Sequence, residues 1–150
     1  MSCIFCRIVA GEIPAEIVAK DEHAVAFLDI APLADGHTVI VPRRHVAMVE
    51  EVNPDDARGL FAMVQRLAGP VREALGGAGT TIGINDGAVT GQTIPHVHVH
   101  IVPRWPGDGA GSVHTIFPRK AYREIKDVGT LIRAAVAEAS SGIDVGRGGD

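Results

Sequence analysis

The chain has 150 residues, of which 46% are hydrophobic and 21% are charged, so we expect one globular domain with one core. The formal net charge is -4 and no dense run of Lys and Arg occurs, which argues against nucleic acid as a partner, because duplex binding depends on many cationic contacts to phosphates. The apolar runs are too short to span a bilayer and the N-terminus lacks the pattern of a secretion signal, so we expect no membrane association and a cytoplasmic location.

The first part of the chain predicts three short strands, at Glu16–Asp21, Ala24–Ile30 and His37–Pro42. Each run is brief and rich in apolar and β-branched residues, and the third follows the turn signal Asp35-Gly36. Because the runs are closely spaced, we expect them to be antiparallel neighbours joined by short turns.

A helix is predicted after Asn53, which is a plausible N-cap with proline at the first helical position. The glycine pair at 76–77 ends the pattern. Pro70 lies inside it and is expected to kink the helix or split it near Ala68 or Gly69. The apolar stripe of this helix consists of Leu60, Val64, Leu67, Val71 and Leu75.

Two further strands are predicted at Thr80–Asp86 and His96–Pro103, and a second helix from about Ala121 to Ala139. The Gly-rich end, residues 140–150, is expected to be disordered. The elements together predict an α+β domain over residues 1–139, in which helices pack on a five-stranded antiparallel sheet.

The segment "HVHVHIVPR" alternates histidine with apolar residues. In a strand, His96, His98 and His100 would share one face, which is expected to open onto a cleft or the surface, while the apolar residues between them face the core. Imidazole can accept a proton, donate one or attack as a nucleophile near neutral pH. A phosphate fits the gap of about 6.5 to 7 Å between neighbouring histidines on one face.

Three interpretations of the histidines stay open on the residues alone. In the first, His98 attacks phosphorus while a protonated outer histidine binds the phosphate oxygens. In the second, a His-x-His pair points two nitrogens at one zinc ion. In the third, the rings are ordinary surface or core histidines.

The cysteines Cys3 and Cys6 form a C-x-x-C pair, too few for a disulfide framework. On its own the pair fits a redox site, half of a zinc site or coincidence. The loop "NDGAVTGQT" fits either a simple turn or a cradle whose backbone N–H groups bind an anion.

Several segments resemble the histidine-triad (HIT) family of nucleotide hydrolases and transferases. They are the triad "HVHVHIV" together with "CRIVAGEIPAEIVAKDEHAVAFLDIAP", "GHTVIVPRRH" and "GINDGAVTGQTIPHVHVHIVPR", in the family's order. The resemblance covers Cys3 to Arg104.

The resemblance implies that His98 attacks the α-phosphate of a nucleotide and forms a nucleotidyl-histidine intermediate, which water hydrolyses. It implies that His96 and His100 orient and protonate, and that His37 is the family's upstream histidine. The transferase branch has Gln at the third triad position, so a hydrolase is expected here.

The resemblance also implies a site for a purine nucleotide, with Asp29 on the ribose hydroxyls. Leu28 stands where the Hint branch has His, which is expected to alter the contacts to the base. The residues matching the family's base pocket are Phe5, Ile8, Ile13 and Ile30, and those matching its phosphate site are Asn85, Gly91, Gln92 and Thr93, beside His98 and His100.

Many bacterial members pair the N-terminal cysteines with two histidines, which implies a structural zinc ion on Cys3, Cys6, His45 and His96. A zinc ligand cannot also transfer protons freely, so a bound zinc would give His96 a structural and orienting role. No organic cofactor is expected.

The family is usually homodimeric, with a sheet continuous across the interface. The substrate stays open between a nucleoside phosphoramidate and a dinucleoside polyphosphate. Two alternatives are a nucleotide-binding scaffold with little turnover and a zinc enzyme that uses the triad as ligands.

Overall fold

The computed structural model describes residues 3–117 and 123–139. The chain forms two compact units, Met1–Ala110 and Gly111–Asp150. The predicted tail at 140–150 lies outside the described residues. Among the residues that are described, no helix combines the length and apolarity needed to cross a membrane.

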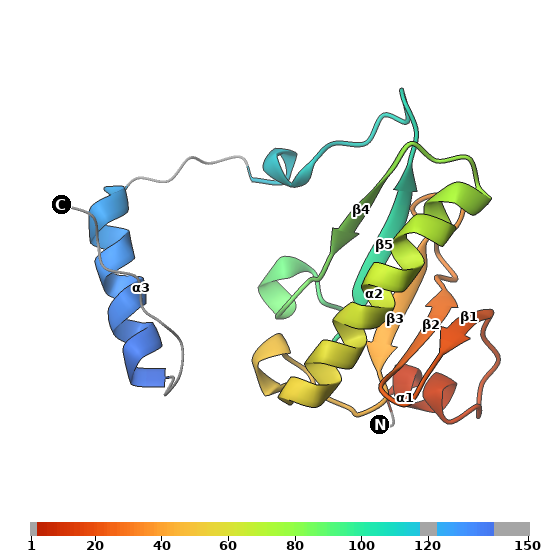
Figure 1. The fold of residues 1–150 in the computed structure, drawn as a ribbon, viewed down its shortest axis with the longest axis horizontal. Helices are drawn as coiled ribbons and strands as arrows, with labels where there is room; N and C mark the ends of the chain where they lie inside the picture. Colours follow the sequence, from red (N-terminus) through yellow and green to blue (C-terminus); the bar gives the residue numbers. More distant parts are fainter. Residues whose placement is uncertain (1–2, 118–122, 140–150) are drawn as a thin grey trace. The chain divides into compact units, whose positions relative to one another are not determined.

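The first unit contains a five-stranded sheet in the order β1-β2-β3-β5-β4, and every neighbouring pair is antiparallel (Figure 1). The predicted α+β fold with five antiparallel strands is therefore confirmed. The strands are β1 (Ile17–Lys20), β2 (Ala24–Leu28), β3 (Thr38–Pro42), β4 (Gly79–Gly83) and β5 (Val99–Arg104). The strand that carries the end of the triad, β5, lies between β3 and β4.

Helix α2 (Pro54–Ala74) begins and ends where its capping residues predict. The Asn53 side chain accepts a hydrogen bond from the Asp56 amide at 2.9 Å. At the other end, Gly76 has a positive φ of 65°, and the Gly77 amide donates to the Arg72 carbonyl at 2.9 Å. A positive φ costs glycine little, so the chain can turn sharply back toward β4.

The predicted split of this helix near Ala68 or Gly69 is wrong, because α2 runs unbroken through Pro70. Proline lacks the N–H that would bond the carbonyl four residues earlier, at Arg66. Both residues are exposed, so water can hydrate that carbonyl. The helix therefore tolerates a proline on its solvent face.

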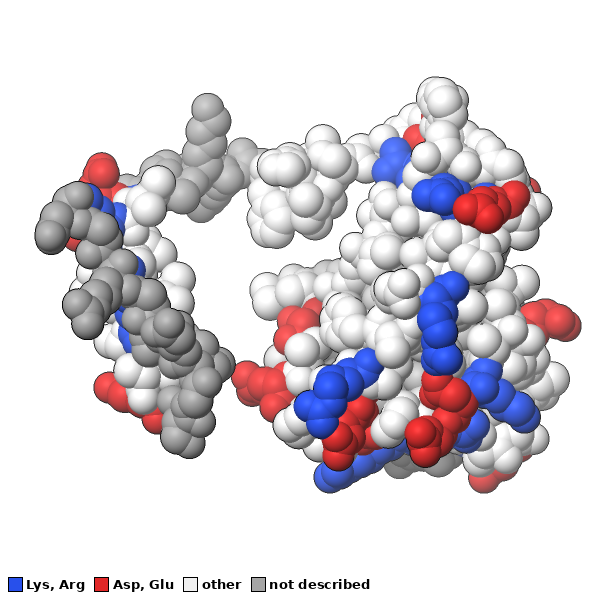
Figure 2. Space-filling model, in the orientation of Figure 1, with Lys and Arg blue, Asp and Glu red and all other residues white. Residues whose placement is uncertain are grey.

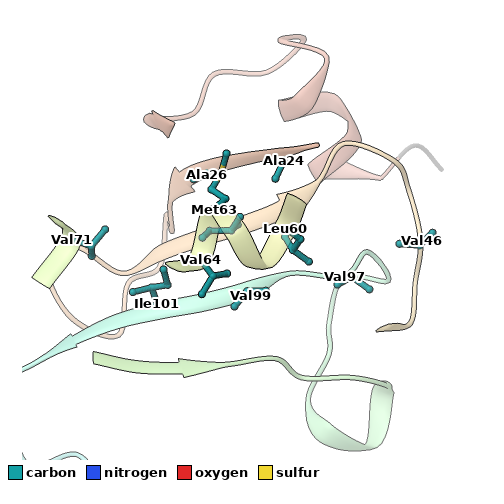
Figure 3. Close-up of a cluster of buried hydrophobic side chains, with 11 residues drawn as sticks. Ala24, Ala26, Val46, Leu60, Met63, Val64, Val71, Val97, Val99 and Ile101 are labelled. Atoms are coloured by element: carbon teal, nitrogen blue, oxygen red, sulfur yellow. The ribbon is translucent and has the colours of Figure 1, made fainter. Parts of the chain in front are cut away.

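The main core lies between α2 and one face of the sheet (Figure 3). Leu60, Met63 and Val64 project from the helix, and alternate residues of the strands, such as Ile40 and Ile101, meet them. The opposite face carries a smaller cluster, to which helix α1 (Ile4–Val9) adds Phe5; its strand members are Val25, Phe27, Val39 and Val41. The alternation leaves His100, which pairs with Val39, on this second face.

Strand β5 starts at Val99, three residues later than predicted, so His96 and His98 precede the strand. The Val97 amide donates to the Val46 carbonyl at 2.8 Å, which ties this segment to residues near His45 rather than to a strand of the sheet. The alternation of faces still extends back to Val97, which is fully buried in the main core.

The second unit contains a short turn, η3 (Val113–Thr115), and the amphipathic helix α3 (Ile125–Ala139). The sequence predicts the start of this helix at about Ala121, a residue outside the described part, and the described helix begins at Ile125. The helix thus exists where it is expected, with a later first residue.

Replacing Leu60 with Ala should lower the free energy of unfolding by about 2 to 5 kcal/mol, because it opens a cavity between α2 and the sheet. Leu60 is 2% exposed, whereas its neighbour Phe61 is 52% exposed. Phe61→Ala is thus the matched control and should cost less than about 1 kcal/mol. Urea unfolding of both variants measures the difference, and equal losses would show that the core is elsewhere.

Candidate active site and metal centre

His98 is held in one tautomer by the backbone of its own segment. Its Nδ1–H donates to the carbonyl of His96 at 2.7 Å. Phe5 supports the ring edge-on, with ring centroids 5.1 Å apart and planes at 70°. Because Nδ1 keeps its proton in this bond, the Nε2 atom of the neutral ring carries a free lone pair. That lone pair is what a nucleophile needs.

A second set of hydrogen bonds defines the tautomers of His37 and His100. The Leu33 amide donates to His37 Nδ1 at 3.1 Å, so the His37 proton must be on Nε2. That Nε2 lies 2.8 Å from His100 Nδ1 and donates to it. The His100 proton is then on Nε2, and this ring lies 4.9 Å from that of His98, centroid to centroid. A neutral ring with an N–H on Nε2 therefore lies beside the His98 ring.

Burial, together with the neighbouring His98 and His37 rings, lowers the pKa of His100 to about 4, while Asp29 opposes the shift. Burial also lowers the pKa of His37, again with Asp29 opposing. The Asp29 carboxylate lies 3.7 Å from His37 Nε2. Near neutral pH both rings are neutral in the free protein, so the expected protonated outer histidine is not His100 in this state.

The His96 ring points away from the other two histidines. Its Nε2–H donates to the Pro42 carbonyl at 2.9 Å. Its Nδ1 atom faces Cys3 Sγ at 3.5 Å, Cys6 Sγ at 3.6 Å and His45 Nδ1 at 3.3 Å. The ring is fully buried, which corrects the expectation that all three triad rings open onto one cleft. The carbonyl of His96, rather than its ring, makes the hydrogen bond to His98.

The side chains of Cys3, Cys6, His45 and His96 together have the dimensions of a tetrahedral zinc site. Their ligand atoms all lie within 4.8 Å of one another, and Cys6 Sγ is 3.4 Å from His45 Nδ1. Tetrahedral zinc, with N ligands at about 2.0 to 2.1 Å and S ligands at about 2.3 Å, needs N–N edges of about 3.3 Å and N–S edges of about 3.5 Å. The donor set and its spacing therefore fit zinc.

The protonation of the ring also suits a metal ion. Since the bond to Pro42 holds the His96 proton on Nε2, the Nδ1 lone pair points at the other ligands. A backbone carbonyl that fixes the tautomer of a metal-binding histidine is a usual outer partner of such a ligand. Burial raises the pKa of the Cys6 thiol, and the neighbouring Cys3 raises it further, which a cation would reverse.

The loop of residues 85–93, which we call the phosphate loop, includes the short turn η2 (Ala88–Thr90). Gly87 and Gly91 have φ angles of 93° and 94°, in the region that favours glycine. Asn85 and Thr93 are exposed. Gln92 bonds the backbone at two places, so its expected contact with phosphate competes with a role inside the protein.

The residues expected to bind the base and ribose differ in exposure. Phe5 is 7% exposed and packs on Phe27 and His98, so it is a core residue that supports the His98 ring. Ile8 and Ile13 are half-buried, and Ile30 is fully exposed. Asp29 Oδ1 accepts a hydrogen bond from the Ala31 amide at 2.8 Å. Contact of these residues with a nucleotide stays a prediction.

Three backbone groups matter to the site and carry no signal in the sequence. They are the carbonyls of His96 and Pro42 and the amide of Leu33. Any residue type offers the same carbonyl, so only the fold reveals which one a ring will meet. The Cys3, Cys6, His45 and His96 set does meet as the resemblance implies.

The charged surface is mixed. On the face in Figure 2, Lys and Arg side chains lie among Asp and Glu side chains. Arg66 bonds Asp21 at 2.5 Å, and Arg72 bonds Glu73 at 3.0 Å. The absence of a nucleic acid partner stays a prediction.

Comparisons with known proteins agree with this geometry. The HIT domain family matches residues 10–107. A HIT-like protein of Methanocaldococcus jannaschii is 44% identical over 128 residues, which cover 83% of this chain and 98% of that protein. The adenosine 5'-monophosphoramidase hnt1 of Schizosaccharomyces pombe is 36% identical over 104 residues, 69% of this chain and 75% of that protein.

One solved structure with this fold contains zinc. The zinc-bound histidine triad family protein of Mycobacterium smegmatis superposes with a TM-score of 0.70 at 40% identity. The match covers 93% of this chain and 96% of that one. The Cys and His cluster of this chain is compatible with zinc as well.

Replacing Cys3 with Ser should weaken zinc binding at least about tenfold, because a tetrahedral site loses a thiolate ligand. Competition with a chromogenic chelator measures the affinity. His114→Ala, at an exposed histidine outside the cluster, is the control and should bind zinc as the wild type does. Wild-type affinity in Cys3→Ser would exclude this set as the metal centre.

The free energy of unfolding should fall as the pH drops from about 6.5 to about 4. In that window an unfolded chain protonates the His100 ring, whereas the folded chain, whose His100 pKa is about 4, does not. The contribution of His100 to the free energy of unfolding is thus complete above the pKa of this ring in the unfolded chain. It is lost as the pH falls toward the pKa of the ring in the folded chain. His100→Gln should flatten the dependence seen in urea titrations at several pH values, and His114→Gln should leave it unchanged.

Proposed function

Because this chain belongs to the HIT domain family, we propose that it is a nucleotide hydrolase that works through a nucleotidyl-histidine intermediate on His98. Family membership and the named phosphoramidase relative support a hydrolase-type function. The observation that carries the proposal is the bond from His98 Nδ1–H to the His96 carbonyl, since it leaves Nε2 of a neutral ring ready to attack.

In the first step, His98 Nε2 forms a bond to the α-phosphorus while the bond from phosphorus to the leaving group breaks, and the departing group takes up a proton from the solvent. The His98 ring becomes cationic, and its Nδ1–H bond to the His96 carbonyl stabilises that charge because a carbonyl dipole accepts better from a cation. The His100 Nε2–H lies beside the reacting centre and donates a hydrogen bond to the developing charge on phosphate or leaving group.

In the second step, water attacks the same phosphorus and releases a proton to the solvent, and the bond to His98 breaks. The nucleoside monophosphate leaves, and the ring returns to its neutral state with its proton on Nδ1. His37 keeps His100 in the tautomer that presents an N–H on Nε2, through the bond of 2.8 Å to His100 Nδ1. The Leu33 amide keeps His37 in its own tautomer in the same way.

Zinc, when bound to Cys3, Cys6, His45 and His96, supplies a structural cross-link between the N-terminal segment and the backbone that carries the triad. Four protein ligands fill a tetrahedral site and leave no open position for substrate. This favours a structural ion over the alternative in which the triad holds a catalytic metal.

For the substrate, we propose a purine nucleoside phosphoramidate, with a dinucleoside polyphosphate as the second candidate. The phosphoramidase relative from fission yeast supports the first. In this proposal Asp29 binds the ribose hydroxyls, since a carboxylate accepts hydrogen bonds from both. The base lies near Ile8, Ile13 and Ile30, and the backbone amides of the phosphate loop bind the phosphate.

Replacing His98 with Asn should reduce hydrolysis of adenosine 5'-phosphoramidate by at least about a thousandfold, because the nucleophile is lost while an amide preserves the bond to the His96 carbonyl. Steady-state assays with this substrate and with a diadenosine polyphosphate measure the loss and rank the two substrate classes. His114→Asn is the control and should keep full activity.

Mass spectrometry of acid-quenched wild-type protein should also show an added nucleoside monophosphate, which is absent from His98→Asn. Two results would contradict the proposal. One is full activity in His98→Asn, and the other is AMP binding by the wild type with neither turnover nor adduct, which identifies a nucleotide-binding scaffold.

A further inference from the structure

The side chain of Gln92 joins two segments that are far apart in the sequence. Its Oε1 atom accepts from the Gly87 amide at 2.8 Å, within the phosphate loop. Its Nε2 atom donates to the Ala47 carbonyl, also at 2.8 Å. The carboxamide thus commits its acceptor and one of its donors to the backbone. It is half-buried, which makes both bonds harder for water to replace.

Ala47 belongs to residues 45–49, which we call the metal arm because they follow directly from the zinc ligand candidate His45. The arm is neither helix nor strand until η1 (Val49–Glu51) begins, so hydrogen bonds must define its path. Glu51 Oε2 accepts from the amides of Ala47 and Met48, both at 3.0 Å. These bonds hold the inside of the arm and leave the Ala47 carbonyl for Gln92.

The metal arm and the phosphate loop meet at a second hydrogen bond. The Val49 amide donates to Asp86 Oδ1 at 2.9 Å. The Asp86 and Gln92 side chains therefore bond the arm from opposite ends of the loop. Between them lies Gly87, whose amide bonds Gln92 and whose φ of 93° depends on the path of the loop.

We infer that Gln92 is a positioning residue that couples the metal centre to the phosphate loop, so that zinc binding and nucleotide binding strengthen each other. The inference rests on the proposed function, since the loop is taken to bind the nucleotide phosphate. Zinc fixes His45 and with it the arm; the Ala47 carbonyl then fixes Gln92, and Gln92 fixes the Gly87 amide. By thermodynamic linkage, zinc then raises the affinity for nucleotide by the same factor by which nucleotide raises the affinity for zinc.

The first test needs no nucleotide. Gln92→Ala should lower the zinc affinity about tenfold in a chelator competition, because His45 is held on a looser arm. Gln65→Ala removes the same side chain from an exposed position on α2 and should bind zinc as the wild type does. Wild-type zinc affinity in Gln92→Ala, with its fold intact by circular dichroism, would overturn the inference.

The second test measures AMP binding by calorimetry, with and without zinc. Removing zinc should weaken AMP binding by the wild type about fivefold or more, and this ratio should shrink toward one in Gln92→Ala. An unchanged ratio would overturn the coupling. A wild type that binds no AMP in either state would contradict the proposed function instead, and the zinc affinities would then decide the role of Gln92 alone.

A third variant separates this hydrogen bond from general loosening. In Gln92→Glu the carboxylate can still accept from Gly87 but repels the Ala47 carbonyl, whereas a protonated carboxyl can donate to it. AMP affinity relative to the wild type at the same pH should therefore recover as the pH falls from about 7 to about 4, through the ordinary pKa of a glutamate side chain. A constant deficit over this range would show that the bond to Ala47 is not what matters.

Discussion

The site depends on the short segment from His96 to His98, and above all on the bond of 2.7 Å between the His98 Nδ1–H and the His96 carbonyl. The His96 ring belongs to the Cys and His cluster, and the His96 carbonyl accepts from His98. A cross-link on the ring therefore also fixes the carbonyl. In the proposed function, an ion bound there would act without touching substrate, since it would hold the carbonyl that selects the tautomer of His98.

Three histidines of one motif thus have three roles, because their hydrogen-bond partners differ. His96 donates to Pro42 and turns a lone pair to the cysteines, and His98 donates to a carbonyl and keeps a lone pair on Nε2. His100 accepts from His37 and keeps an N–H. Burial and the neighbouring rings hold His100 neutral, so its contribution is a fixed dipole rather than a charge.

The antiparallel register and the connections around the sheet bring these partners together. β3 and β5 are neighbours although α2 and β4 separate them in the sequence, and Val39 pairs with His100. His37 stands just before β3, within reach of His100 for that reason. The metal arm leaves the other end of β3 and returns alongside Val97 and Gln92. Strand β3 thus positions both the hydrogen-bonded pair of His37 and His100 and the metal arm.

The sequence by itself determined the five strands, the capped ends of α2, the alternation of histidine with core valines and, through the resemblance, the set Cys3, Cys6, His45 and His96. These features follow from local periodicity, turn chemistry and motif spacing, all of which can be read directly from the sequence. Only the tertiary structure decided that β5 starts at Val99 and that the His96 ring is turned away from the other two. It also decided that α2 continues through Pro70 and that the Gln92 side chain bonds two separate segments. Each of these depends on which backbone carbonyl or amide a side chain meets, and since every residue offers the same backbone groups, no sequence pattern can specify the partner.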